Sequence, residues 1–186
     1  MTLRVGILGG TFDPVHNAHL AIASAALRAL ELEKILWLPT GTPPYRSAPV
    51  APALHRVAML KLATAGEPRY AIDERELRPG ASGFTIDSIA SLKHEHPHNQ
   101  FVLMMGADQY SQRAHWHRWA DIENLCDVAV FARPGSNLNG KAKTIPMTPM
   151  AISASDIRAR IGRGDDVSAL LPPPVLAYIH EQCLYR

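Results

Sequence analysis

Cysteine is scarce in this sequence, and long apolar runs are absent. The 186 residues include two cysteines, Cys126 and Cys183, which form no CxxC or metal-ligand spacing. This argues against a disulfide framework and favours free thiols in a reducing compartment. No apolar run approaches the roughly 18 residues of a membrane span. The opening MTLRVGILGG also lacks the charged head and long apolar stretch of an export signal, so we expect a cytoplasmic protein.

An excess of charge is lacking as well. The net charge is +2 with the histidines neutral, which is too small to favour nucleic acid or a membrane surface as the main partner. No internal repeat, low-complexity tract or linker divides the chain. We therefore expect one domain over residues 1–186, a monomer or homo-oligomer, whose partners are small molecules.

Apolar runs alternate along the chain with helical periodicity. The short runs predict strands at 3–8, 34–38, 70–72, 100–105, 127–132 and 144–146. Helical spacing predicts helices from 17, at 54–62 with Leu54 and Leu62 on the apolar face, at 85–95, from 157 and at 175–181. This alternation is typical of an α/β fold with a doubly wound, mainly parallel sheet flanked by helices. The proline-rich stretch 40–52 predicts a loop.

In such folds, ligands bind beyond the carboxyl ends of the strands, where the strand order reverses. The segments that follow four predicted strands should therefore meet at one rim. These segments are residues 9–19, 40–46, 106–116 and 133–135.

The first of these segments, GGTFDPVHNAH, combines glycines with two histidines. Glycines let the backbone approach a ligand, and a helix that begins near residue 16 presents free N–H groups to an anion. His16 and His19 share one face of that turn, where two imidazole donors suit a phosphate. The stretch contains no GxGxxG, no GxxxxGK[ST] and no serine or cysteine nucleophile. A purely structural histidine pair, or a metal site with Asp13, are the alternatives.

A second stretch, ISASDIRAR, has similar chemistry. Ser153 and Ser155 precede a predicted helical turn, which Ser155 or Asp156 can cap, and Arg158 lies on that turn. Hydroxyls, N–H groups and a guanidinium would form another phosphate cradle. The alternative is an ordinary capped helix with a surface arginine.

The two stretches resemble the paired signatures of the HxGH nucleotidyltransferase superfamily, usually written HxGH and ISxTxIR. Further segments are similar to one branch, the bacterial nicotinate-nucleotide adenylyltransferases. These segments are PPYR at 43–46, DERELRPGASGFT at 73–85, GADQY at 106–110, Trp116, RPG at 133–135 and the tail LLPPPVLAYIHEQCLYR. The resemblance implies transfer of the adenylyl group of ATP to nicotinic acid mononucleotide, with Mg²⁺, by direct in-line attack and without a covalent intermediate.

The resemblance also implies roles for individual residues. His16 and His19 would be catalytic and would stabilise charge on the phosphates. ATP would be bound by Gly9, Gly10, Thr11, Phe12, Arg46, Gly106, Asp108, Arg133, Ser155 and Arg158. The mononucleotide would be bound by Asp13, Tyr45, Thr85, Trp116 and His117. Trp116 would stack on the nicotinate ring, whereas Trp119 is the better core candidate. No protein ligand to a metal is implied.

Three positions depart from the family pattern: Ala18 replaces glycine, Tyr45 replaces histidine, and Ser155 replaces threonine. Two rival hypotheses stay open. One is a sister transferase with another acceptor, and the other is a nucleotide-binding protein that has lost catalysis, with Ala18 as its mark. A metal-dependent phosphohydrolase would need more acidic ligands at the strand ends than the sequence offers. The histidines at 94, 96 and 98 are interpreted as a solvated helix end.

Overall fold

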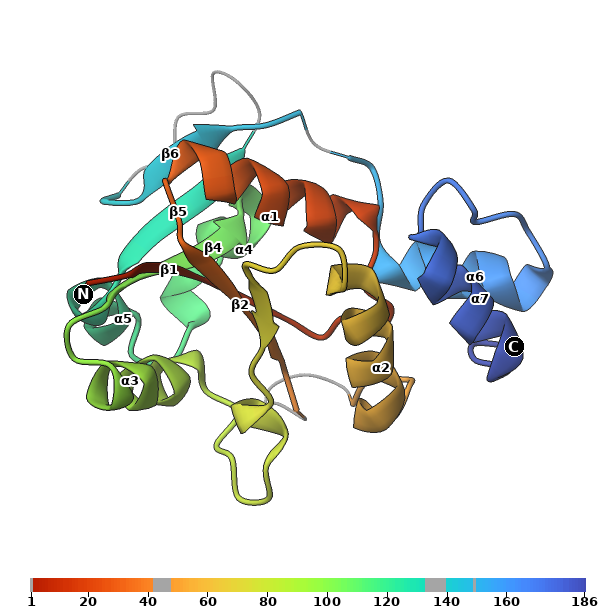
Figure 1. The fold of residues 1–186 in the computed structure, drawn as a ribbon, viewed down its shortest axis with the longest axis horizontal. Coiled ribbons are helices and arrows are strands. Elements are labelled where there is room, and N and C mark those ends of the chain that lie inside the picture. Colours follow the sequence, from red (N-terminus) through yellow and green to blue (C-terminus); the bar gives the residue numbers. More distant parts are fainter. Residues whose placement is uncertain (1, 42–47, 133–139, 149) are drawn as a thin grey trace.

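A parallel β-sheet forms the centre of the protein. The computed structural model describes residues 2–41, 48–132, 140–148 and 150–186. Within them, six parallel strands lie in the order β3-β2-β1-β4-β5-β6 (Figure 1). Their bounds are β1 Arg4–Gly10, β2 Lys34–Pro39, β3 Tyr70–Ile72, β4 Gln100–Gly106, β5 Asp127–Ala132 and β6 Lys143–Pro146. The predicted doubly wound fold is confirmed, and the order reverses between β1 and β4.

Helices cover both faces of this sheet. They are α1 Asn17–Ala29, α2 Ala53–Thr64, α3 Thr85–Glu95, α4 Ala107–Ser111, α5 Trp119–Leu125, α6 Ala154–Arg163 and α7 Pro173–Glu181, with 3-10 turns η1 Arg75–Leu77 and η2 Arg113–His115. Leu8 belongs to the core that α1, α2, α6 and α7 cover. Its neighbour Ile7 belongs to the core that α3, α4 and α5 cover. Because successive strand residues face opposite sides, both sides of β1 must be apolar.

The structure corrects the expected apolar face of α2. Leu54 is 77% exposed and Leu62 is also exposed, whereas Val57 and Leu60 are buried. Arg56, which exposes 2% of its surface, occupies the inner side of the first turn because its guanidinium binds backbone carbonyls there. The prediction that Leu54 and Leu62 face the core was therefore wrong.

Several short elements between residues 75 and 125 were not predicted. They are η1, α4, η2 and α5, none longer than seven residues. Elements this short show too few periodic positions for an apolar pattern to emerge. They matter because α4 follows β4 directly and, with Trp116 after η2, shapes one side of the cleft described below.

The remaining absences concern membranes and disulfides. No helix in the described part of the chain combines the length and apolar character that crossing a membrane requires. Cys126 and Cys183 are free thiols, and burial raises the pKa of Cys126 to about 11. The Cys126 thiol therefore stays protonated at neutral pH.

Candidate active site

A cleft of about 400 Å³ opens at the carboxyl ends of β1 and β4. It gathers the segments that follow β1, β2 and β4, as predicted. Its lining includes Gly9, Gly10, Thr11, Phe12, Asp13, His16, His19, Thr40, Glu76, Gly83, Thr85, Gly106, Asp108, Gln109 and Trp116. Most of the predicted site residues therefore share one cavity.

The two histidines form a stacked pair at the start of α1. His16 is the residue before the helix, and its backbone N–H donates to Nδ1 of His19 at 3.3 Å. The ring centroids lie 3.8 Å apart, and the edge of Phe12 supports His19 with centroids 5.0 Å apart. Because Nδ1 of His19 accepts a hydrogen bond, the neutral ring carries its proton on Nε2. His19 therefore offers an Nε2–H donor.

Burial keeps this pair uncharged. It lowers the pKa of His16 to about 4. It also lowers the pKa of His19 well below the ordinary value, and charge on the neighbouring His16 lowers it further. Both rings are neutral donors at neutral pH, and a bound anion would favour their protonated forms. Nδ1 of His16 is buried and finds no partner in the described residues.

Glycines leave room in the floor of the cleft. A Cβ added at Gly9 or at Gly106 would meet nothing within 4 Å. Gly10 differs, because a Cβ there would lie 2.9 Å from the ring of Phe12. Phe12 is buried and has a left-handed backbone with φ 50°. Gly9 and Gly106 thus keep space open for a ligand, whereas Gly10 seats the Phe12 ring that supports His19.

The second predicted phosphate segment begins α6. Ser153 caps the helix, and its Oγ accepts the backbone N–H of Asp156 at 3.2 Å. The prediction that Ser155 or Asp156 caps it was wrong, because only Ser153 has the extended backbone of a cap residue. Ser155 is exposed, with its Oγ 3.2 Å from that of Ser153. Neither Ser155 nor Arg158 is among the residues that line the cleft.

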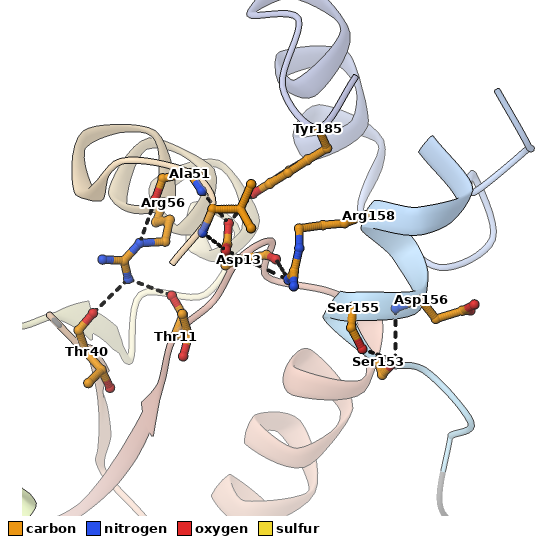
Figure 2. Close-up of polar contacts among 11 residues, drawn as sticks. Thr11, Asp13, Thr40, Ala51, Arg56, Ser153, Ser155, Asp156, Arg158 and Tyr185 are labelled. Atoms are coloured by element: carbon orange, nitrogen blue, oxygen red, sulfur yellow. Dashed lines mark hydrogen bonds and ion pairs between the residues drawn. The ribbon is translucent and has the colours of Figure 1, made fainter. Parts of the chain in front are cut away.

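Arg158 instead joins α6 to the turn after β1 (Figure 2). Its Nη1 donates to the Asp13 carbonyl at 2.7 Å and lies 3.8 Å from the Asp13 carboxylate. In Figure 1, α6 and α7 accordingly lie beside the N-terminal end of α1. A guanidinium placed there holds the turn and stands next to the histidine end of the cleft.

Asp13 is predicted to contact the mononucleotide, but its carboxylate already has internal partners. Oδ2 accepts the backbone N–H of Val50 at 2.7 Å. Oδ1 accepts the N–H of Ala51 at 3.1 Å and the hydroxyl of Tyr185 at 2.7 Å. The described residues contain no group of three or more His, Cys, Asp or Glu side chains that could hold a metal. The alternative of a metal site at Asp13 therefore finds no support in them.

Arg56 also fixes the turn after β1, and the sequence did not predict this role (Figure 2). Its Nη1 donates to the carbonyls of Thr11 at 2.7 Å and Thr40 at 2.9 Å, and its Nε donates to that of Ala51 at 3.2 Å. One guanidinium thus joins the ends of β1 and β2. No local pattern distinguishes this arginine from a solvated one.

The end of the cleft on the other face of the sheet, beside the core that α3, α4 and α5 cover, is aromatic. Trp116 lines it half-buried, and Trp119 supports Trp116 edge-on with ring centroids 5.8 Å apart. Thr85, the first residue of α3, lines this end too. His117 is exposed and is not among the lining residues, and its ring packs against Phe84 at 4.3 Å. Asp108 is exposed on the rim.

Glu76 is a lining residue that the sequence did not reveal. It is buried, and Oε1 accepts the hydroxyl of Ser88 at 2.8 Å. Burial raises the pKa of this carboxyl. A lone glutamate in a polar loop gives no signal of such a position. Three predicted site residues, Tyr45, Arg46 and Arg133, lie outside the described residues.

Comparison with known proteins decides the family. The cytidylyltransferase-like family matches residues 7–160. A probable nicotinate-nucleotide adenylyltransferase of Laribacter hongkongensis is 39% identical over 209 aligned residues, which cover 99% of this chain and 95% of the relative. One from Bordetella petrii is 40% identical, with 98% and 99% covered. The chain belongs to the nicotinate-nucleotide adenylyltransferase branch of this family. It is a nucleotidyltransferase, and the resemblance read from its motifs is confirmed.

Solved structures of similar proteins agree on the fold of this adenylyltransferase branch. The nicotinic acid mononucleotide adenylyltransferase of Plasmodium falciparum, complexed with NaAD, superposes with a TM-score of 0.85 at 18% identity, covering 98% of this chain and 97% of the other. A putative nicotinate-nucleotide adenylyltransferase from Vibrio parahaemolyticus gives 0.76 at 16% identity, with 100% and 96% covered. At these identities the likeness shows the shared fold alone.

Proposed function

We propose that this chain transfers the adenylyl group of ATP to nicotinic acid mononucleotide and releases pyrophosphate. The product is nicotinic acid adenine dinucleotide, a precursor of NAD. The observation that carries the proposal is the pair of neutral imidazoles in a glycine-floored cleft whose far end is aromatic. The names of relatives that span nearly the whole chain support the same reaction.

The transfer is a direct displacement at phosphorus. A phosphate oxygen of the mononucleotide attacks the α-phosphorus of ATP and forms the new P–O bond. The bond between the α-phosphorus and the oxygen that bridges to the β-phosphorus breaks, and pyrophosphate leaves with its electron pair. His16 and His19 donate hydrogen bonds to the phosphates and stabilise the growing charge. No nucleophilic side chain is required. The stacked rings are fixed before substrate arrives, so they need little rearrangement during the reaction.

The two substrates occupy different ends of the cleft in this proposal. Trp116 stacks on the pyridine ring, and Thr85 with the backbone at His117 binds its carboxylate. Gly106 and Asp108 contact the adenosine, and Gly9 leaves space for the phosphates. The family resemblance adds Arg46 and Arg133 as phosphate contacts. It also adds Ser155 and Arg158, which stand at the start of α6 beside the histidine end and would reach only the part of the phosphate chain that projects from the cleft.

A magnesium ion fits this site only as a companion of the nucleotide. The described residues provide no cluster of protein ligands, and the carboxylate of Asp13 is occupied by three hydrogen bonds. Mg²⁺ commonly binds through substrate phosphates and water. When bound, it would neutralise part of the phosphate charge, and the protein would orient the phosphates by hydrogen bonds.

The test is a pyrophosphate-release assay with ATP, Mg²⁺ and one acceptor at a time. We expect turnover with nicotinic acid mononucleotide and much slower turnover with its amide or with phosphopantetheine. Preference for phosphopantetheine would favour a sister transferase. Tight ATP binding without turnover, with activity restored by Ala18→Gly, would instead identify a binding protein that has lost catalysis.

A further inference from the structure

Three distant segments of the chain meet at Asp13 (Figure 2). Asp13 exposes 2% of its surface, and its carboxylate accepts the backbone N–H groups of Val50 and Ala51. The third donor is the hydroxyl of Tyr185, 172 positions further along the chain and 2.7 Å from Oδ1. A single buried carboxylate therefore joins the turn after β1, the segment before α2 and the C-terminal tail.

The tail reaches Asp13 by a specific and unfavourable backbone path. Cys183 and Tyr185 have φ values of 51° and 65°, in the left-handed region that non-glycine residues seldom adopt. Between them, the N–H of Leu184 donates to the carbonyl of Ile179 at 3.0 Å. The side chains of Leu184 and Tyr185 pack against the core that α1, α2, α6 and α7 cover. Such a path persists only where the surrounding contacts hold it.

Tyr185 does not belong to the cleft itself. It is not among the residues that line the cleft, so it does not touch a substrate there. Burial and the adjacent Asp13 carboxylate raise the pKa of its hydroxyl, which remains a hydrogen-bond donor at neutral pH. The charged groups that face it are Asp13, Arg158 and Arg56.

The turn that Tyr185 holds is continuous with the histidine pair. Pro14 and Val15 are buried and link Asp13 to His16 without an exposed residue between them. The backbone N–H of His16 in turn fixes the tautomer of His19. A shift of Asp13 would therefore reach both imidazoles. A misplacement of about 1 Å in a reacting constellation can cost up to roughly a hundredfold in rate.

We propose that Tyr185 is a positioning residue for adenylyl transfer. Its hydroxyl completes the hydrogen bonding of the Asp13 carboxylate and so fixes the turn that aims His16 and His19 at the phosphates. The kinetic part of this proposal rests on the proposed function. The structural part, that the tail contact sets the environment of the imidazoles, does not.

The test compares two matched variants, Tyr185→Phe and Tyr178→Phe. Each loses one hydroxyl from the C-terminal segment, but the Tyr178 hydroxyl lies 3.0 Å from Nδ1 of His55 and has no contact with Asp13. The assays are run well below the melting temperature of either variant. We expect Tyr185→Phe to lower kcat about tenfold, while the KM for ATP and the KM for the mononucleotide stay within about twofold of the parent values. Tyr178→Phe should keep kcat within about twofold of the parent chain.

A second measurement follows the histidine ring signals by NMR without substrate. Tyr185→Phe should shift the signals of His16 and His19, and Tyr178→Phe should shift only that of His55. Equal losses of kcat in the two variants, an unchanged kcat in Tyr185→Phe, or unmoved His16 and His19 signals would each overturn the proposal. A parent chain that forms no dinucleotide would overturn the proposed function, and the NMR comparison would still decide the tail contact.

Discussion

The two ends of the cleft are built in different ways. At the histidine end, a buried carboxylate and a buried guanidinium connect β1, β2, the segment before α2 and the C-terminal tail. At the aromatic end, α4 presents an exposed Asp108, the residue that follows η2 is a half-buried Trp116, and a ring contact supports this tryptophan.

This difference fits the two tasks that the proposed reaction would set. Stabilising charge on phosphates requires donors that are fixed in advance, because donors that must reorganise lose much of their effect. Choosing an acceptor requires shape and a flat apolar face, which a tryptophan supplies by itself. The comparison predicts that changes at the histidine end mainly alter kcat, whereas changes at the aromatic end mainly alter one KM.

The largest effect is expected at His19. His19→Ala removes the Nε2–H donor and should lower kcat roughly a hundredfold or more, since one preorganised donor contributes about 3 kcal/mol to the transition state. The measurement is steady-state pyrophosphate release. His115→Ala, which changes an exposed histidine on η2, is the control and should leave the rate unchanged. A His19→Ala enzyme as fast as the parent would remove His19 from the mechanism.

A smaller and differently placed effect is expected at Trp116. Trp116→Ala should raise the KM for the mononucleotide about tenfold, since stacking on an aromatic side chain contributes roughly 1–3 kcal/mol per base. The KM for ATP should stay within about twofold. Trp119→Phe keeps a ring behind Trp116 and should change neither value. If ATP affinity fell instead, the assignment of the two ends would be reversed.

The glycines of β1 test whether the cleft floor is open. A Cβ at Gly9 meets nothing within 4 Å, so Gly9→Ala should leave stability unchanged and raise the KM for ATP about fivefold by filling ligand space. A Cβ at Gly6 would lie 2.7 Å from Cδ1 of Leu32. Gly6→Ala should therefore lower the free energy of unfolding by about 1–3 kcal/mol without changing the KM. If both variants changed the free energy of unfolding and the KM for ATP to the same extent, Gly9 and Gly6 would not have these different roles.

The smallest effect is a dependence of stability on pH. Unfolded His16 takes up a proton near its ordinary pKa of 6.5, whereas the folded residue resists protonation until about pH 4. The free energy of unfolding should therefore fall as pH drops through this window, by about 1 kcal/mol from His16 between pH 7 and pH 5.5. Urea unfolding of the parent and of His16→Gln at both pH values measures it. Equal losses in both proteins would mean that His16 is not the group responsible.

Local patterns were sufficient to predict much of the fold and one end of the site. Alternating apolar runs located the strands, and the rule that ligands bind beyond the carboxyl ends of parallel strands predicted the edge at which the cleft lies. The turn after β1 could be interpreted because its glycines and histidines are neighbours in the sequence and also in the cleft. Gly9, His16 and His19 needed no distant partner to be recognised as cleft residues.

The sequence could not show contacts made by residues far apart in the chain. Asp13 was expected at the substrate, yet its partners come from residues 50, 51 and 185. Arg56 appeared to belong to an ordinary amphipathic helix, whose apolar face was misassigned for that reason. Ser153 caps α6 because its backbone is extended there. The residue type alone does not distinguish it from Ser155.

The position of β1 between β2 and β4 has a consequence for synthesis on the ribosome. β2 follows β1 closely, but β4 begins at residue 100, and its terminal Gly106 forms part of the cavity floor. A nascent chain that has emerged only through the end of α3 therefore contains His16 and His19 but lacks the part of the cleft that β4 and the residues after it form. Nucleotide capture must await emergence of the second half of the polypeptide, so a shortened translation product that stops before β4 should retain no ATP.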